Sequence, residues 1–393
     1  MAAKRPATFH VGLGEATGAV ADLGIFVPLA TALILVNGLD AGAVLICAGV
    51  LVIAAGIAFG IPFPVQPLKA LTAIAVAQGL APATISAAGI ELGAILLLLT
   101  IGGAGAWLAR WFVKPVIRAL QLGVGVLLAV GAWKLVTNPP SVFQGVPSRS
   151  WLLVLAVGAF LGVWVAARAG KPWVALGVLI AGIVATVVAA QPSLGAPSFS
   201  LPTFAVPDAA AFSTAFFLLV VPQIPLTFGN AIVAVNDLAH EEFGDRAKRV
   251  SVPRVLLSGG LANVVTGLLG GMPMCHGSGG LTAHVRLGAR YAGMNLLLGG
   301  VFLGLGLLFA DQVPALLGLL PVWVLGGFLA YAGLRHALLV TDQHGYDLVV
   351  AIIAGVLGAW LGNLAVTAAL ALLAVHLRRA LSSSRASADT LET

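Results

Sequence analysis

Apolar runs of about 20 residues follow one another along almost the whole chain, separated by short stretches of Gly, Pro and charged residues. An α-helix of this length is what crosses the ~30 Å hydrocarbon core of a membrane. Of the 393 residues, 60% are hydrophobic and 9% are charged, which is too little charge for a surface that faces water. The sequence therefore predicts an all-α polytopic membrane protein.

The net charge of +6 does not indicate a nucleic-acid partner, because the Lys and Arg residues lie in short loops beside apolar runs, as the positive-inside rule describes. The first run, from about Val11 to Val36, contains Glu15 and Asp22 and is too long and too polar for a cleavable signal peptide. Cys47 and Cys275 both lie within apolar runs, without zinc-site spacing. We predict no nucleic-acid partner, no metal and no cofactor.

Two of the runs are interrupted in the same way. Residues 60–73 and 271–283 each begin with Gly-x-Pro and end with Leu-Thr-Ala, with helix-breaking residues between. We expect an extended segment followed by a short helix, which starts at Pro67 in the first case and near Ser278 in the second. About six extended and twelve helical residues would cross the membrane with their junction near mid-depth. Two broken spans, one per half, point to the binding site of a transporter.

The runs predict fourteen spans, near residues 12–36, 41–60, 67–79, 86–108, 115–137, 151–168, 173–190, 212–235, 253–270, 278–290, 292–310, 314–338 and a last pair within 346–378. The last pair has the alternative of one tilted helix kinked near Gly362. With both termini in the cytoplasm, Arg149 is the one loop charge among Lys and Arg that falls outside. This pattern favours seven plus seven spans as inverted repeats.

The predicted units are a first repeat at 10–192, an external linker at 193–207, a second repeat at 208–379 and a disordered cytoplasmic tail at 380–393. Weak internal matches agree with this division. Residues 27–29 (VPL) resemble residues 224–226 (IPL), and the interval from Gly125 to Gly131 recurs from Gly327 to Gly333.

Lys69 lies in the first turn of the first half-helix, at a depth where an unpaired lysine costs at least about 2.5 to 3.5 kcal/mol. Two converging helix N-termini add about half a charge each, so the pocket would hold about +2, which matches a tetrahedral dianion. The alternative is that Lys69 snorkels or pairs with Glu15 or Asp22.

Other candidate substrate-binding residues are polar residues or glycines of the two motifs and of the eighth span: Gln66, Gln223, Asn230, His276, Gly277, Ser278 and Gly279. Each polar side chain has a structural alternative. His276 has the alternative of structural hydrogen bonding, and Ser278 that of an ordinary N-cap. Gln66 has the alternative of tying down its own turn, while Gln223 and Asn230 have that of interhelical bonding. Glu15 and Asp22 are candidates for proton coupling.

An enzymatic function is a weaker interpretation. Residues 276–280 (HGSGG) differ from the G-x-S-x-G nucleophile elbow, which requires Gly at the position of His276. The surrounding membrane spans also lack the strand-turn-helix setting of that motif. We therefore predict that the chain is not an enzyme.

Four stretches resemble the molybdate transporter family, distant relatives of the sulfate permeases: residues 62–70 (PFPVQPLKA), 272–281 (MPMCHGSGGL), 118–123 (RALQLG) and 225–231 (PLTFGNA). The resemblance implies a fold of inverted repeats similar to the uracil permease. Its core would comprise spans 1–4 and 8–11, and its gate spans 5–7 and 12–14. The site would lie between spans 3 and 10.

We predict a secondary active transporter that imports an oxyanion, and we favour molybdate. Alternatives are sulfate or tungstate transport, nucleobase transport and, last, an intramembrane hydrolase. Nucleobase permeases place a carboxylate in the eighth span, where Gln223 and Asn230 are neutral. The expected location is the cell (inner) membrane, with lipid around the protein. A coupling proton and a second copy of the chain are candidate partners.

Overall fold

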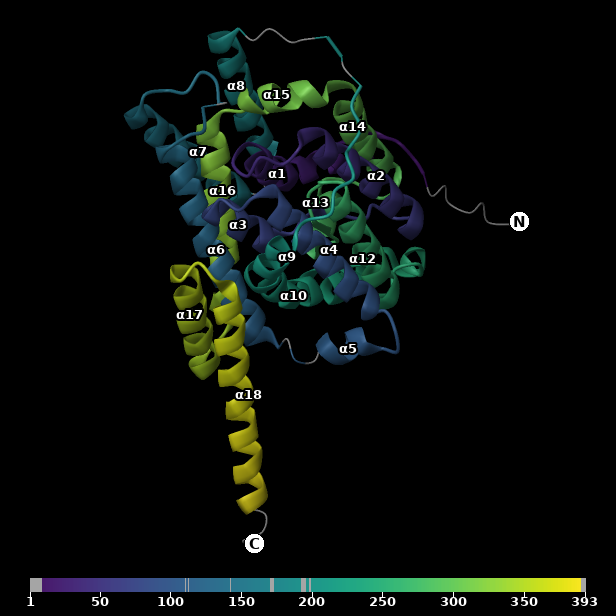
Figure 1. Cartoon of the computed structure of the whole chain (residues 1–393), viewed down its shortest axis with the longest axis vertical. Coiled ribbons are helices and arrows are strands. Elements are labelled where there is room, and N and C mark those ends of the chain that lie inside the picture. Colours follow the sequence, from purple (N-terminus) through teal and green to yellow (C-terminus); the bar gives the residue numbers. More distant parts are fainter. Residues whose placement is uncertain are drawn as a thin grey trace, which may run out of the picture.

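Helices make up nearly the whole of this computed structural model, which describes residues 9–109, 111, 113–141, 143–169, 173–191, 196–197 and 199–389 (Figure 1). The elements before residue 200 are α1 (Leu13–Leu35), α2 (Ala41–Phe59), β1 (Gln66–Pro67), α3 (Lys69–Gln78), α4 (Pro82–Leu98), α5 (Ala104–Ala109), α6 (Lys114–Thr137), α7 (Arg149–Arg168) and α8 (Trp173–Ala190).

The elements after residue 200 begin with one long helical segment of changing pitch: α9 (Ala209–Ala215), π-helical η1 (Phe216–Val220), α10 (Val221–Leu226), π-helical η2 (Thr227–Val233) and α11 (Ala234–Phe243). The rest are η3 (Gly244–Ala247), α12 (Val252–Leu268), β2 (Met274–Cys275), α13 (Ser278–Arg286), α14 (Gly293–Phe309), η4 (Ala310–Gln312), α15 (Val313–Gly318), α16 (Val322–Ala337), η5 (Leu338–Asp342), α17 (Gly345–Trp360) and α18 (Leu364–Asp389).

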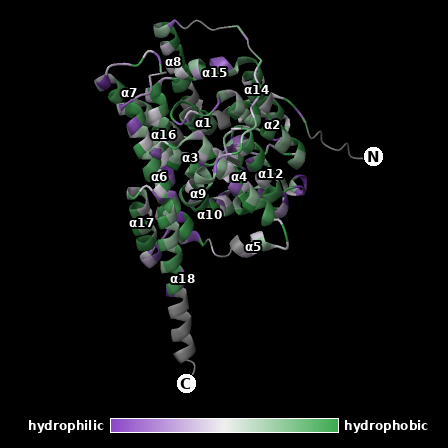
Figure 2. Cartoon of the chain, in the orientation of Figure 1, coloured by the Kyte–Doolittle hydropathy of each residue, from purple (hydrophilic) through white to green (hydrophobic). Residues whose placement is uncertain are grey.

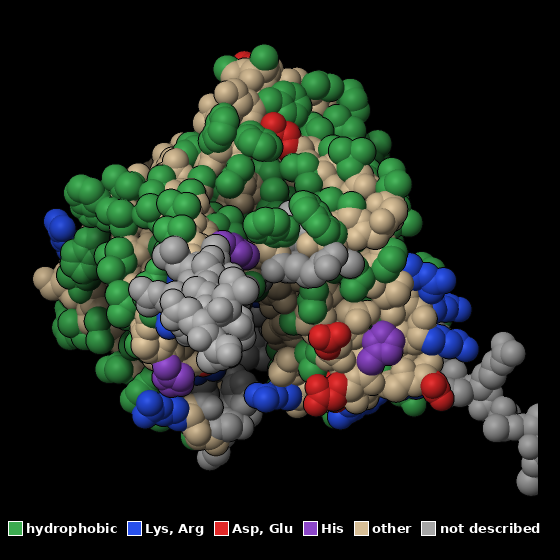
Figure 3. Space-filling view, turned by 90° about the horizontal axis from the view of Figure 1, so that it is seen from below, with side chains coloured by type: hydrophobic (Ala, Val, Ile, Leu, Met, Phe, Trp, Pro, Cys, Tyr) green, Lys and Arg blue, Asp and Glu red, His purple; other side chains and the backbone are tan. Residues whose placement is uncertain are grey.

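Six helical segments of the described chain are long and apolar enough to cross a membrane, by length and composition: Ala41–Phe59, Lys114–Thr137, Arg149–Ala166, Ala209–Ala247, Gly293–Gly318 and Val322–Asp342. Shorter apolar helices accompany them, among them Pro82–Leu98, Val252–Leu268 and Gly345–Trp360. Figure 2 shows hydrophobic residues along most of the helices. Large apolar side chains such as Trp151, Val188 and Trp360 are exposed on the surface, as in a protein surrounded by lipid. From the end where α18 projects, apolar side chains cover much of the molecule, and most charged side chains lie along one side (Figure 3).

The helices form two groups (Figure 1). One group contains α6, α7, α16, α17 and α18, which pack on one another. The other contains α1 to α4 and α9 to α14, in which α2 packs on α14 and α4 on α12. Helix α3 of the second group also packs on α6 of the first. The two short strands belong to the second group, in which β1 packs on α1 and β2 on α12.

Paired glycines let the helices of these pairs approach closely. A methyl group on Gly49 of α2 would lie 2.7 Å from the carbonyl oxygen of Gly299 on α14, and the reverse distance is also 2.7 Å. Gly93 of α4 and Gly260 of α12 make the equivalent contact at 2.7 and 3.1 Å. Gly125 and Gly333, two of the residues in the internal sequence match, form the same contact between α6 and α16.

One expectation is met and two details differ. The last pair consists of two helices as predicted, α17 and α18, separated by Gly362 with a φ of +65°, a conformation that suits glycine. Pro67 belongs to β1, and α3 begins two residues later at Lys69, because Pro67 pairs with Met274. Helix α18 continues to Asp389, past the predicted start of disorder, since its Ala- and Ser-rich end contains no Gly or Pro. The count of fourteen spans stays a prediction.

The α2–α14 crossing offers a test of the fold. Gly299→Ala should destabilise the protein by about 1–3 kcal/mol, because its methyl group would lie 2.6 Å from Ile53 and 2.7 Å from the Gly49 oxygen. Thermal unfolding in detergent measures the loss. The adjacent Gly300→Ala is the control, since nothing lies within 4 Å of its methyl group, and it should be neutral or stabilising. Equal melting temperatures for both variants would contradict the close crossing.

Candidate functional site

The two interrupted segments meet inside the second group of helices. Strands β1 and β2 pair antiparallel, with Gln66 opposite Cys275 and Pro67 opposite Met274. The backbone N–H of Leu68 also donates to the carbonyl of Pro273 over 3.1 Å. Directly after these strands the chain turns into α3 and α13, the second of which begins at the predicted residue, Ser278. The pairing therefore brings the N-termini of two helices to one place.

Neither helix has a side-chain cap at its N-terminal residue, Leu68 for α3 and Gly277 for α13. The first backbone N–H groups of a helix have no acceptor within it, and they carry about half a positive charge together. In α3 one of them, Leu71 N–H, donates to Gln223 Oε1 over 3.1 Å. Gln223 is buried and its Nε2 donates to Thr227 Oγ1, so this side chain is held in place from both ends.

Donor groups converge at Gly277. A methyl group placed on Gly277 would lie 3.4 Å from Asn230 Nδ2 and 3.6 Å from Lys69 Nζ. The same point is 3.2 Å from Gln66 Oε1. The first turn of α13 is open here, because Ser278 is half-buried and Gly279 is exposed.

Ser278 orients the amide of Asn230. Its hydroxyl donates to Asn230 Oδ1 over 2.6 Å, so the carbonyl end of that amide is occupied and the Nδ2 end faces Gly277. Ser278 is thus the first helical residue of α13, not its N-cap as the alternative interpretation had it. Gln223 and Asn230 also serve different helices: Gln223 bonds to α3 and Asn230 to α13.

Gln66 is fully buried against the first turn of α13. A methyl group on Gly280 would lie 2.4 Å from Gln66 Nε2, so only glycine leaves room for this side chain. The glycines at 277 and 280 therefore let a residue from the first half of the chain lie directly on a helix from the second half.

Lys69 is half-buried, and its ammonium forms no hydrogen bond or ion pair with any side chain that the structure describes. It interacts electrostatically with His336 of α16. The predicted alternative partner Glu15 is buried elsewhere, at the far end of α13, where its Oε1 accepts from the backbone N–H of Arg290 over 3.2 Å. The side chain of Asp22, the other coupling candidate, lies outside the described residues.

His276 is buried beside the strands, and both ring nitrogens have partners. Nδ1 lies 2.9 Å from the carbonyl oxygen of Pro64, and Nε2 lies 3.0 Å from Ser258 Oγ. A carbonyl only accepts, so Nδ1 carries the proton and Nε2 accepts from the hydroxyl. The ring also packs on Phe59 and Phe63. This geometry favours the structural alternative for His276, because no donor is left to face an anion.

Two further polar residues contact the interrupted segments, and the sequence analysis did not select them. Asn263 of α12 bonds to Met274, and Asn295 of α14 bonds to Phe63. Both are fully buried. A buried polar residue within an apolar run was the available signal, since such residues face other helices.

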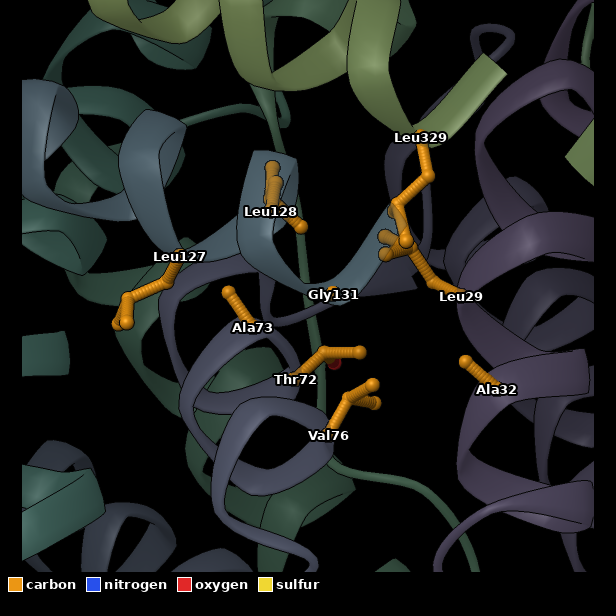
Figure 4. Close-up of a pocket in the computed structure, with 9 residues that line it drawn as sticks. All are labelled: Leu29, Ala32, Thr72, Ala73, Val76, Leu127, Leu128, Gly131 and Leu329. Carbon is orange, nitrogen blue, oxygen red and sulfur yellow. The ribbon is translucent and has the colours of Figure 1, made fainter. Parts of the chain in front are cut away.

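A small cavity lies behind α3, between the two groups of helices. Figure 4 shows side chains of α3 facing α6 across it. Its lining is almost entirely apolar: Leu29, Ala32, Thr72, Ala73, Val76, Leu127, Leu128, Gly131 and Leu329. The hydroxyl of Thr72 is buried there without a hydrogen-bond partner among the described residues. The two groups thus meet through a largely apolar surface near the site.

Within the part of the chain that the structure describes, no group of three or more His, Cys, Asp or Glu residues could hold a metal ion. The groups that converge at Gly277 are one cation, amides and helix N-termini, without a carboxylate. Such a set of donors is suited to an anion.

Known proteins resemble this chain closely enough to assign it to a protein family. The family model described as a molybdate transporter of the MFS superfamily matches residues 14–128 and 215–335. Molybdate transporter 2 of Arabidopsis thaliana is 32% identical over 374 residues, which cover 85% of this chain and 80% of that protein. The chain belongs to the molybdate transporter family. Another relative, Molybdate transporter 1 of Chlamydomonas reinhardtii, is 30% identical and is aligned over 83% of each chain.

Two solved structures show the fold of this molybdate transporter family member. The transmembrane domain of the cyanobacterial bicarbonate transporter BicA has a TM-score of 0.64 at 17% identity, over 92% of this chain and 96% of that one. SLC26A9 has a TM-score of 0.64 at 14% identity, over 93% of this chain and 65% of that one. The resemblance expected from the four sequence motifs is confirmed.

The bonds of His276 lead to a prediction on stability. His276→Ala should lower the melting temperature measured without ligand, because the Pro64 carbonyl and the Ser258 hydroxyl are left without a partner at about 1–3 kcal/mol each. Ser258→Ala removes only the second bond and should cost less. A His276→Ala protein as stable as the wild type would show that these bonds contribute nothing.

Proposed function

We propose that this protein is a secondary active transporter that imports a tetrahedral oxyanion, molybdate, which binds between the N-termini of α3 and α13. The observation that carries the proposal is the convergence of Lys69 Nζ and Asn230 Nδ2 on Gly277, at the start of α13. Relatives named molybdate transporters and the fold shared with BicA and SLC26A9 support an anion as the substrate.

Charge balance explains why the site needs a lysine. A dianion taken out of water requires opposite charge nearby, and two helix N-termini together supply only about one unit. The ammonium of Lys69 adds a full charge and has no carboxylate partner among the described side chains to neutralise it. The total of about +2 matches an oxyanion of charge −2.

We assign the candidate residues to two roles. The anion-binding surface consists of Lys69, Asn230, Gly277, Ser278 and Gly279. Gln66 packs beside it on the first turn of α13. Gln223 and His276 hold α3 and the strands and do not contact the anion. Glu15 and Asp22 remain the candidates for proton coupling.

The transport proposal includes an arrangement in the membrane. The segments β1–α3 and β2–α13 are each one broken span, and the fourteen spans form inverted repeats at 10–192 and 208–379 around a linker at 193–207. Gly49–Gly299 and Gly93–Gly260 support the repeat, because each joins one helix from either half in the same manner. The group with α1–α4 and α9–α14 is the core. The gate comprises the group with α6, α7 and α16–α18, together with α8 and α15. Both termini are cytoplasmic, and the membrane is the cell (inner) membrane.

Lys69 provides the most direct test. Lys69→Gln should weaken molybdate binding by roughly a hundredfold, and Lys69→Arg much less, because the variant arginine keeps the charge. Calorimetric titration of purified protein with molybdate and with sulfate measures both variants at low and high salt. The loss should persist at high salt, since a partly buried charge is screened less.

Lys248→Gln is the control for Lys69, because Lys248 is an exposed loop residue away from the strands. Wild-type affinity in a folded Lys69→Gln protein would contradict the proposed role of the charge. It would also favour the alternative of a neutral substrate.

Gly277 provides a second test, with Gly300 of α14 as its control. Gly277→Ala should weaken molybdate binding by about tenfold or more, because its methyl group would occupy the point where the donors converge. Gly300→Ala places a methyl group in open space on α14, outside the anion-binding surface, so its affinity should stay close to that of the wild type. Titration of both variants decides, and equal affinities would place the anion elsewhere.

A further inference from the structure

We propose that Asn263 and Asn295 are positioning residues of the anion site. The carboxamide of Asn263 takes the place of a neighbouring strand beside Met274 of β2, and that of Asn295 does so beside Phe63, in the segment that leads into β1. The inference rests on the proposed function, since its purpose is to fix where α3 and α13 begin. Neither residue has a place on the anion-binding surface itself.

Asn263 reproduces the pairing of a strand residue. Its Oδ1 accepts from the N–H of Met274 over 2.9 Å, and its Nδ2 donates to the carbonyl of the same residue over 2.8 Å. Nδ2 donates as well to the carbonyl of Gly259 in its own helix, over 2.7 Å. Both ends of the carboxamide are therefore used, and the side chain is 1% exposed.

Asn295 forms the same pattern with Phe63. Its Oδ1 accepts from Phe63 N–H over 3.1 Å, and its Nδ2 donates to the Phe63 carbonyl over 2.7 Å. Nδ2 donates also to the carbonyl of Val52 over 3.0 Å. The same arrangement, an asparagine carboxamide bonded to both the N–H and the C=O of one residue, thus occurs on two segments that are far apart in sequence.

Phe63 and Met274 are corresponding residues, since each directly follows the Pro of a Gly-x-Pro motif. Their asparagines come from helices that do not correspond. Asn263 precedes Gly271 by the interval that separates Val52 from Gly60, and Val52 carries no amide. In the first half the amide instead arrives from α14, beside the Val52 carbonyl. The backbone N–H and C=O groups of Phe63 and Met274 are thus paired by asparagines from helices that do not correspond, which indicates that these hydrogen bonds themselves are needed.

These bonds act on the site through short stretches of backbone. Met274 pairs with Pro67, which is followed at once by Leu68 and Lys69. On its own chain Met274 is followed by Cys275, His276 and Gly277. A shift of either strand would therefore move the Lys69 ammonium relative to the N-terminus of α13. Because anion binding depends on the mutual placement of these groups, we expect affinity to depend on both asparagines.

Asn263→Asp is the sharpest test, because aspartate has nearly the same shape but offers only acceptors. An oxygen would then face the carbonyls of Met274 and Gly259, to which Asn263 now donates. Titration of the purified protein with sodium molybdate should show the affinity reduced by about tenfold or more, with binding stoichiometry unchanged. Asn295→Asp should behave alike. Asn263→Ala, which introduces no charge, should show the same direction of change if the Asp variant does not fold.

Asn37→Asp is the matched control. Asn37 is also a buried amide that donates to two carbonyls, those of Ala75 and Leu80, each over 2.9 Å. It lies at the other end of α3, so its variant should lose thermal stability and keep its affinity for molybdate. A residue that merely stabilises the fold would lower the amount of active protein, whereas a positioning residue changes the Kd of the protein that is folded.

The outcomes separate the two proposals. Wild-type protein that binds no oxyanion would overturn the proposed function, and this inference with it. Wild-type binding together with an unchanged Kd in Asn263→Asp and Asn263→Ala would overturn the positioning role alone. An equal loss of affinity in Asn37→Asp would do the same, because the effect would then follow general destabilisation.

Discussion

Extended backbone inside a membrane protein has N–H and C=O groups that lipid cannot bind, and β1 and β2 are too short to satisfy one another fully. Their pairing uses one edge of each segment. The other edge is satisfied at Phe63 and Met274 by asparagine side chains, and at Pro64 by the His276 ring. These bonds allow the junction between strand and helix to lie inside the protein. The start of α3 and α13, and so the whole candidate site, depends on them.

A helix that begins inside a protein offers unpaired N–H groups there, and the surroundings select what they bind. Around Gly277 the neighbours include an ammonium, an amide N–H group oriented by Ser278 and the first turn of α13, together with the amide oxygen of Gln66. The carboxylate of Glu15 is held at the other end of α13 by the Arg290 backbone, where it does not oppose an anion. Placement of the acidic group away from the helix starts is as important to the charge of the site as placement of Lys69 near them.

Much of this site was predictable from local sequence, because Pro and Gly act on the backbone within a few residues. The two Gly-x-Pro motifs located the interruptions, and the helix start at Ser278 was confirmed. Contacts between distant segments were not predictable. Asn295 lies on α14, far along the chain from Phe63, so no spacing rule connects them. The strand position of Pro67 depends on its partner Met274, and the role of His276 depends on Pro64 and Ser258. The sequence leaves both substrate contact and structural hydrogen bonding open for His276, because burial and hydrogen-bond partners decide between them.

The two halves share an architecture and differ in chemistry, and this difference is what an anion site requires. Corresponding segments supply Lys69 from the first half and the glycine-rich start of α13 from the second. A lysine in both would leave excess positive charge in the site whenever no anion is present, with a large desolvation cost. One lysine with two helix ends avoids that excess, and glycines opposite the lysine let the ligand approach the backbone closely. In the proposed site, the difference between the two segments matches the charge of one oxyanion, while the pairing of β1 with β2 fixes the place at which that charge is presented.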